Sequence, residues 1–172
     1  MPRRSIRPSV VILAVVALAV AVKLFVLDAV VVEGRSMLPL FKPGSVVLVL
    51  RCAYGIRNPL GAGYLAVWGS PRRGDVVAAA SPRDGRVVVK RVVAAGPAEL
   101  AVAAGRLVGS SVDAPLSAEQ ASRFGDAARI PEGSVFLLGD NRNDSVDSRD
   151  YGPVAISALY GRAIAGSRRA AP

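Results

Sequence analysis

The longest hydrophobic run of the chain covers residues 10–27 and carries a single charge, Lys23. At a rise of about 1.5 Å per residue, a helix of this length spans about 27 Å, which is close to the hydrocarbon thickness of a bilayer. A cleaved secretory signal and a buried soluble helix are the alternatives. Lys23 and four apolar residues follow the small residues Ala19 and Ala21, and this argues against cleavage there. The run therefore predicts one transmembrane anchor.

Charges beside this run predict its orientation. Arg3, Arg4 and Arg7 precede it. Positive residues are enriched on the cytoplasmic side of membrane helices, so we expect residues 1–9 in the cytoplasm. Residues 28–172 would then form a domain on the extracytoplasmic face of the cell membrane.

Beyond the anchor, short valine-rich segments alternate with clusters of Gly, Pro and Asp, which is typical of an antiparallel β domain. Between two such segments, residues 96–130 carry weaker signals: a poor hairpin at 100–107 and a short helix at 117–123, capped by Ser117 with Gln120 three residues on. The fold class expected is mainly β, an antiparallel-sheet core with a small insertion at 96–130, preceded by one N-terminal transmembrane helix. The predicted strands are residues 29–32, 45–51, 75–80, 86–94, 134–138 and 159–165.

Composition narrows the classes of function. The net charge of +9 would suit nucleic acid, but the arginines are spread along the chain and few aromatic side chains can stack on bases, so we expect no nucleic-acid partner. Cys52 is the single cysteine, which excludes an internal disulfide. Histidine is absent, and the acidic residues of 140–150 lie beside Arg142 and Arg149, where ion pairing is the simpler use. We therefore predict no metal and no cofactor.

Lysine is rare here: of 22 basic residues, three are lysines. Where any cation suffices the chain uses arginine, so a retained lysine indicates a property that arginine lacks, chiefly loss of its proton near neutral pH. Lys23 belongs to the anchor and Lys42 to a hydrated turn. Lys90 lies in the valine-rich segment 87–93, where the strand period of two puts it on a face with valines and Arg91 on the other. Lys90 is thus the candidate for a desolvated base, the alternative being an edge-strand charge that prevents aggregation.

Ser36 is the candidate nucleophile. Without histidine, a serine needs another base, and a lysine amine serves if burial lowers its pKa from about 10.4 toward 7. Ser36 follows Gly34 by two positions, and its own N–H is suited to an oxyanion hole. The residues alone do not place Ser36 beside Lys90.

Four motifs follow the anchor in order: GRSMLP at 34–39, RGDVV at 73–77, KRVV at 90–93 and GDNRNDSVDSR at 139–149. In order and spacing they resemble the bacterial type I signal peptidases, or leader peptidases, over nearly the whole chain, and the last motif is the most specific. The resemblance implies a mostly β catalytic core of antiparallel sheets with a variable second domain. Residues 96–130 look like a much reduced version of that second domain.

The resemblance also implies roles for single residues. Ser36 matches the nucleophile, Lys90 the general base and Ser145 the serine that orients the lysine amine. Gly34 stands where some members have a serine that donates to the oxyanion hole, so backbone donors such as the N–H of Ser36 would serve here. The residues that match the charged pairs bracing the site are Asp140, Arg142, Asp147 and Arg149.

The function implied is a membrane-anchored serine endopeptidase that removes N-terminal signal peptides from exported preproteins with a Ser-Lys dyad. Its partners would be those signal peptides, the lipid bilayer and the protein-export machinery. The anchor at residues 10–27 argues against a soluble self-cleaving repressor with the same chemistry. Two alternatives stay open: a dedicated pilin or conjugation-type processing peptidase, and a catalytically inactive anchored β protein that binds signal peptides.

Overall fold

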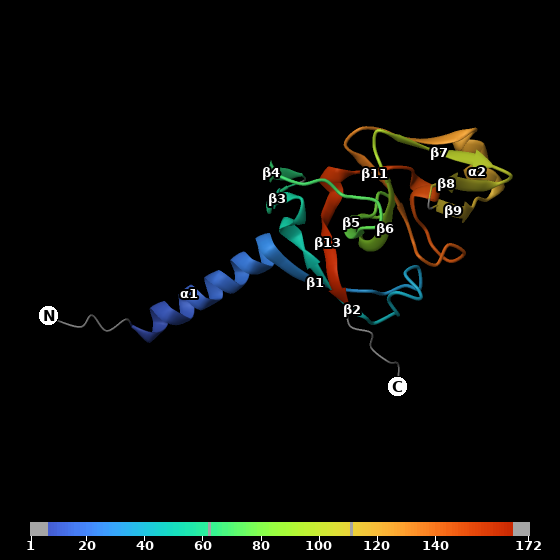
Figure 1. Ribbon diagram of the computed structural model, residues 1–172. Coiled ribbons are helices and arrows are strands. Elements are labelled where there is room, and N and C mark those ends of the chain that lie inside the picture. The colour runs from blue at the N-terminus through green and yellow to red at the C-terminus, as the bar shows by residue number, and fades with distance from the viewer. Residues whose placement is uncertain (1–6, 62, 111, 167–172) are drawn as a thin grey trace.

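The computed structural model describes residues 7–61, 63–110 and 112–166, so the predictions for Arg3 and Arg4 lie outside the described residues. Helix α1 (Pro8–Ala21) projects from the rest of the domain (Figure 1). It continues into a π-helical segment η1 (Val22–Val26), and neither segment contains a buried residue. In the described part of the chain, this is the one helix long and apolar enough to cross a membrane, by length and composition. Leu27, predicted as the last residue of the anchor, starts strand β1 instead because it pairs with Leu50.

The six predicted strands all form and belong to one antiparallel sheet. In the described residues this sheet has seven strands, in the order β1-β2-β13-β5-β6-β11-β12. Side chains alternate with a period of two in β2, where Val47 and Val49 are buried while Val46 and Leu48 face outward; β5 and β11 are buried over most of their length. The predicted mainly β fold is confirmed. The strands are β1 (Leu27–Val31), β2 (Val46–Leu50), β5 (Val76–Ala80), β6 (Val87–Ala95), β11 (Ser134–Leu138), β12 (Val154–Ala155) and β13 (Leu159–Gly166).

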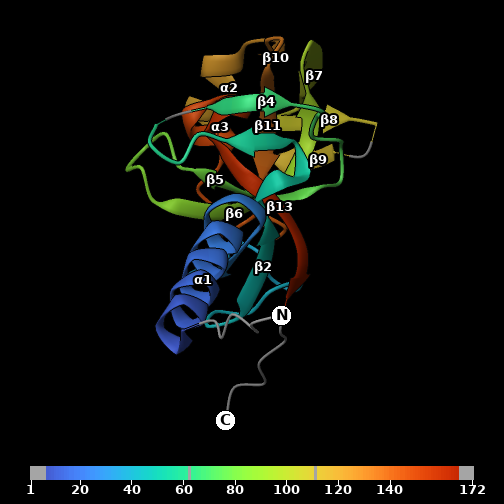
Figure 2. The same cartoon turned by 90° about the vertical axis from the view of Figure 1, so that its left-hand side faces the viewer.

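A two-stranded hairpin that the sequence did not predict leaves this sheet after the short 3-10 turn η2 (Arg51–Ala53). It consists of β3 (Gly55–Arg57) and β4 (Tyr64–Val67). The residue before it, Tyr54, donates a hydrogen bond from its hydroxyl to Asp75 (2.9 Å), which ties the base of the hairpin to the turn before β5. Figures 1 and 2 place this hairpin on the same side of the domain as α1.

Residues 96–130 form a second sheet on the side of the domain away from α1 (Figure 1). The predicted hairpin at 100–107 is present as β7 and β8, and the predicted cap is present too: Ser117 and Gln120 form a capping box at the start of α2 (Ala118–Phe124). The strands of this sheet, in the order β10-β7-β8-β9, are β7 (Ala98–Ala103), β8 (Arg106–Gly109), β9 (Val112–Pro115) and β10 (Ala127–Ile130). The remaining short elements are α3 (Ser148–Tyr151) and η3 (Ile156–Ala158).

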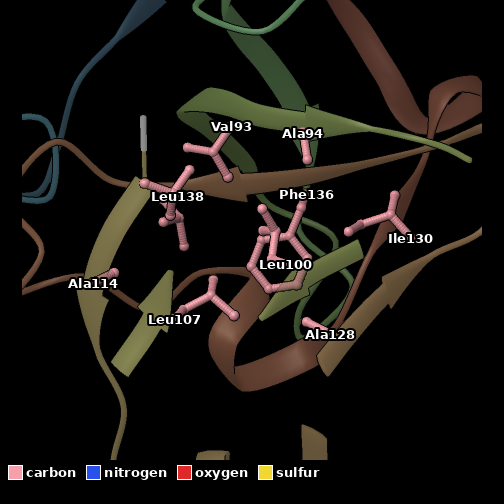
Figure 3. Close-up of a cluster of buried hydrophobic side chains, with 10 residues drawn as sticks. Val93, Ala94, Leu100, Leu107, Ala114, Ala128, Ile130, Phe136 and Leu138 are labelled. Atoms are coloured by element: carbon pink, nitrogen blue, oxygen red, sulfur yellow. The ribbon is translucent and has the colours of Figure 1, made fainter. Parts of the chain in front are cut away.

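Two apolar clusters fix the positions of strand β11 and of the segment that carries Ser36. Phe136 and Leu138 of β11 pack with Leu100 and Leu107 of the second sheet, so the two sheets share one core (Figure 3). On another part of the main sheet, Met37 is fully buried in a second cluster. The residue after Ser36 is therefore a core residue, which fixes where the Ser36 segment lies.

Candidate active site

Lys90 lies on β6 with its side chain withdrawn from water. Its residue is 3% exposed, and Nζ donates a hydrogen bond to the Ser145 hydroxyl at 3.0 Å. Burial lowers the pKa of Lys90 below its ordinary value of 10.5, because the ammonium loses hydration that the neutral amine does not need. Nearby Asp147 opposes this shift and Arg149 supports it. The amine is therefore easier to deprotonate than that of an ordinary lysine.

The strand that carries Lys90 is paired along only part of one edge. On one side β5 pairs with it throughout the region, with Val77 opposite Lys90. On the other side β11 pairs with β6 only from Arg91 onward. Among the described strands, none pairs with this edge over residues 87–90, so Lys90 stands where the sheet opens.

Ser36 is held in place by the loop that follows β11. The backbone N–H of Asn141 donates to the Ser36 carbonyl at 2.9 Å, and the Asn141 side chain donates to the Arg35 carbonyl at 3.3 Å. A Cβ atom on Gly139 would lie 2.6 Å from the Ser36 carbonyl oxygen and 2.3 Å from Ser145 Oγ. Only glycine permits so close an approach, and it brings the Ser36 segment and Ser145 together.

Ser36, Lys90 and Ser145 line one groove of about 1030 Å³. One wall is the end of β1 and the residues after it, 30–36, and the other is the unpaired edge 87–90. The amine of Lys90 bonds to Ser145; among the described residues, the Ser36 side chain makes no hydrogen bond. Gly34 also lines the groove, and a Cβ there would meet nothing within 4 Å, so the backbone beside Ser36 faces open space.

A buried ion pair braces the loop beneath Ser145. Asp147 and Arg149 are 0% and 4% exposed, and their charged groups lie 2.9 Å apart. Asp147 also accepts from the N–H of Gly139 at 3.0 Å, while Arg149 donates to the Ser145 carbonyl at 3.3 Å. One ion pair thus holds both Gly139, which packs against the Ser36 carbonyl, and Ser145, which accepts a hydrogen bond from the Lys90 amine.

Asp140 pairs with a residue that the sequence did not single out as part of the site. Arg91 binds both its carboxylate oxygens at 2.7 Å and donates to the Gly74 carbonyl. Arg142 instead donates to the carbonyl of Gly139, and burial of the Arg142 guanidinium lowers the pKa of that group. The strand period gave a hint of this role, because it placed Arg91 on the face of the strand opposite Lys90. It did not identify Asp140 as the partner of Arg91. Among the residues that the structure describes, no cluster of His, Cys, Asp or Glu could hold a metal ion.

Known proteins match this chain over most of its length. A family model described as "Signal peptidase, peptidase S26" matches residues 5–166. A signal peptidase I of Bacillus caldolyticus is 30% identical over 163 residues, covering 86% of this chain and 82% of that protein. A probable thylakoidal processing peptidase 2 of Arabidopsis thaliana is 31% identical over 140 residues, covering 77% of this chain but 36% of that longer protein. A solved signal peptidase I of Enterococcus faecalis is 28% identical, with a TM-score of 0.41, over 56% of this chain and 98% of that one.

Proposed function

Because the chain belongs to the peptidase S26 family of signal peptidases, we propose that it cleaves signal peptides with a Ser-Lys dyad made of Ser36 and Lys90. One observation carries this proposal: the Lys90 amine is buried, is hydrogen-bonded to Ser145, and faces the groove that Ser36 lines. Burial disfavours the ammonium form, so a lysine kept from water gives up its proton more readily than an exposed lysine. The enzyme class is that of a serine endopeptidase.

The proposed reaction proceeds in two stages. Neutral Lys90 takes the hydroxyl proton of Ser36, whose oxygen attacks the scissile carbonyl carbon, while the N–H of Ser36 donates to the oxyanion. The C–N bond breaks as Lys90 passes its proton to the leaving amine, which leaves an ester on Ser36. Lys90 then takes a proton from water, the resulting nucleophile attacks the ester, and the proton returns to Ser36 oxygen. Ser145 orients the amine through both stages.

The substrate is proposed to bind as an extended strand in the groove. The edge of β6 at residues 87–90 offers unpaired backbone groups, and β1 is an edge strand of the same sheet. Addition of a strand at such an edge gives affinity through backbone hydrogen bonds and specificity through alternate side chains. The first and third side chains before the cut would be small.

The anchor sets the proposed location. Arg7 precedes α1, so the positive-inside bias puts the N-terminal side in the cytoplasm and residues 28–172 on the extracytoplasmic face of the cell membrane. There the catalytic domain, with 96–130 as its reduced insertion, would meet signal peptides beside the bilayer and the protein-export machinery.

Cleavage of a purified preprotein by the full chain in detergent tests the dyad. Ser36→Ala and Lys90→Arg should each lower turnover at least about a thousandfold, the second because a guanidinium stays protonated. The matched control, Lys42→Arg, changes an exposed lysine and should keep full turnover. Circular dichroism checks that each variant is folded. Retained turnover in Lys90→Arg would refute the base, and a cellular role that survives Ser36→Ala would favour a binding protein.

A further inference from the structure

The β3–β4 hairpin exposes large apolar side chains to its surroundings. Leu60 at its tip is 96% exposed, Leu65 and Val67 on β4 are each 66% exposed, and Trp68 is 58% exposed. Single exposed apolar residues are ordinary on a protein surface, but a group of this size gathered on one projecting element marks an interaction site.

The same hairpin presents no charge outward. Residues 54–69 contain one charged side chain, Arg57, in a chain that is 20% charged overall. Arg57 is 8% exposed and turned inward, where it donates to the Leu159 carbonyl at 2.5 Å and lies 4.2 Å from the ring centre of Tyr160. The outer surface of the described hairpin residues is therefore apolar and uncharged.

The base of the hairpin is fastened to the end of the anchor. Arg51, in the turn that leads into β3, donates to the carbonyl of Leu24 at 2.9 Å and to the carboxylate of Asp28 at 3.2 Å. Leu24 belongs to the last turn of the apolar helix, so this contact sets the hairpin base level with the end of the membrane span. Figures 1 and 2 show the hairpin and α1 on one side of the domain.

We infer that the β3–β4 hairpin inserts into the bilayer surface as a second membrane contact beside α1. Apolar side chains with an aromatic residue suit the interfacial layer of a membrane, and the lack of outward charge removes the cost of burying one there. Trp68 already donates its indole N–H to the Cys52 carbonyl at 3.1 Å, so its ring can enter an apolar layer without losing a hydrogen bond to water.

Two contacts fix an orientation that one helix alone leaves free. A single anchor permits rotation of the domain about the helix axis, whereas a helix and a hairpin together define how the groove faces the membrane. The inference rests on α1 lying in a bilayer and is independent of the chemistry proposed for Ser36.

Trp68 is the single tryptophan of the sequence, so intrinsic tryptophan fluorescence of the full chain reports on the hairpin alone. We would reconstitute the chain in phosphatidylcholine vesicles and add lipids brominated near the headgroup end of the acyl chain. Bromine should quench Trp68 strongly, and iodide in the water should quench it at least about threefold less than free tryptophan amide.

A tip variant and a matched control sharpen the test. Leu60→Asn with Leu65→Asn should restore iodide quenching and reduce bromine quenching, while Val108→Asn, which changes an exposed valine of the second sheet, should do neither. In detergent, all three proteins should cleave a peptide substrate equally, so a failure of the dyad is separable from a failure of the hairpin.

Three outcomes would overturn the inference. One is full iodide quenching of the unaltered chain with no bromine quenching. Another is protection from iodide that is lost as the protein is diluted in lipid, which would assign the surface to a second copy. The third is protection seen in native membranes but not in pure lipid, which would assign it to a protein partner.

Discussion

Two neighbouring regions of the molecule are ordered by opposite means. The site loop, residues 139–150, is fixed by buried charge, with the Asp147–Arg149 pair at its centre. The second sheet, at residues 96–130, is fixed by apolar packing, and its ion pairs, such as Arg106–Asp113, lie at the surface. Charge-assisted hydrogen bonds specify direction, which a loop beside reacting groups needs, whereas apolar packing specifies volume and suffices for a scaffold.

The two regions meet along a polar seam. Arg149 donates to the carbonyl of Pro115 at 2.9 Å, and the Gln120 side chain donates to Asp150 at 2.7 Å. If buried charge orders the site loop and apolar packing orders the second sheet, loss of the Asp147–Arg149 pair should lower both activity and stability, while damage to the second sheet should lower stability alone. Four changes, taken from the largest expected effect to the smallest, test this division.

Asp147→Asn should have the largest effect. The change leaves the guanidinium of Arg149 buried without a counter-charge, and loss of one partner of such a pair costs about 3 to 5 kcal/mol of unfolding free energy. Turnover should fall too, because Asp147 holds Gly139. Thermal unfolding followed by circular dichroism, with preprotein cleavage below the transition, measures both. Asp113→Asn, which breaks the exposed pair of the second sheet, is the control and should change neither; an equal loss there would erase the distinction between the regions.

Leu107→Ala should cost about 3 kcal/mol of unfolding free energy, since it removes a fully buried side chain from the shared core and leaves a cavity. Turnover per folded molecule should stay within about twofold of the unaltered protein. Val108→Ala changes the next residue, whose side chain is partly exposed, and should cost clearly less. A large fall in turnover for Leu107→Ala at a temperature where it is folded would show that the second sheet shapes the groove.

Ser145→Ala tests a single hydrogen bond within the site loop. Without its acceptor, the Lys90 amine is free to turn from Ser36, and turnover should fall about 10- to 100-fold, or about 1.4 to 2.7 kcal/mol of barrier, with little change in KM. Ser148→Ala is a matched control: its hydroxyl binds the N–H of Leu137, so its loss should lower stability and leave turnover unchanged. Equal turnover in Ser145→Ala and the unaltered protein would remove Ser145 from the proposed site.

The lowered pKa of Lys90 predicts how activity and stability depend on pH. Activity should rise with pH as the amine loses its proton, at a pH below the ordinary lysine value of 10.5. Stability should rise in the same direction: between the lowered pKa and 10.5 the unfolded chain binds a proton that the folded chain does not. Below the lowered pKa the folded protein bears the full cost of a buried ammonium. A pH–rate profile with no acid limb would contradict the role of Lys90 as base.

Much of the main sheet was predictable because its strands are short valine-rich segments bounded by clusters of Gly, Pro and Asp. Burial alternates along β2, whereas β5 and β11 are buried over most of their length, and in sequence each of the three is a largely apolar run. The β3–β4 hairpin was missed because its strands are three and four residues long and neither forms a valine-rich run. We attribute the exposure of the apolar hairpin side chains to membrane contact. A sequence pattern that reports burial inside the protein cannot detect such a role.

The site was predictable only in part, for a different reason. A lysine among valines indicated a desolvated amine, and Lys90 is indeed buried. The pairing of Arg91 with Asp140 was not predicted, since the partners lie 49 positions apart and meet only because β11 ends beside β6. The close approach at Gly139 is likewise a tertiary fact: nothing near that glycine in sequence indicates that the Ser36 carbonyl packs against it.

Ser117→Ala should have the smallest effect and tests the seam between the two regions. The Ser117 hydroxyl accepts the N–H of Gln120 at 3.1 Å, and loss of such a helix cap costs about 1 kcal/mol. Ser117→Asp, which keeps an acceptor, should restore stability. Gln120 also reaches Asp150, whose carboxylate accepts the N–H of Asp147. If turnover of Ser117→Ala falls with stability and recovers in Ser117→Asp, the cap acts on the site through this chain of hydrogen bonds, and the second sheet is more than a scaffold. Unchanged turnover, our expectation, means that the buried Asp147–Arg149 pair holds the loop without help from the cap.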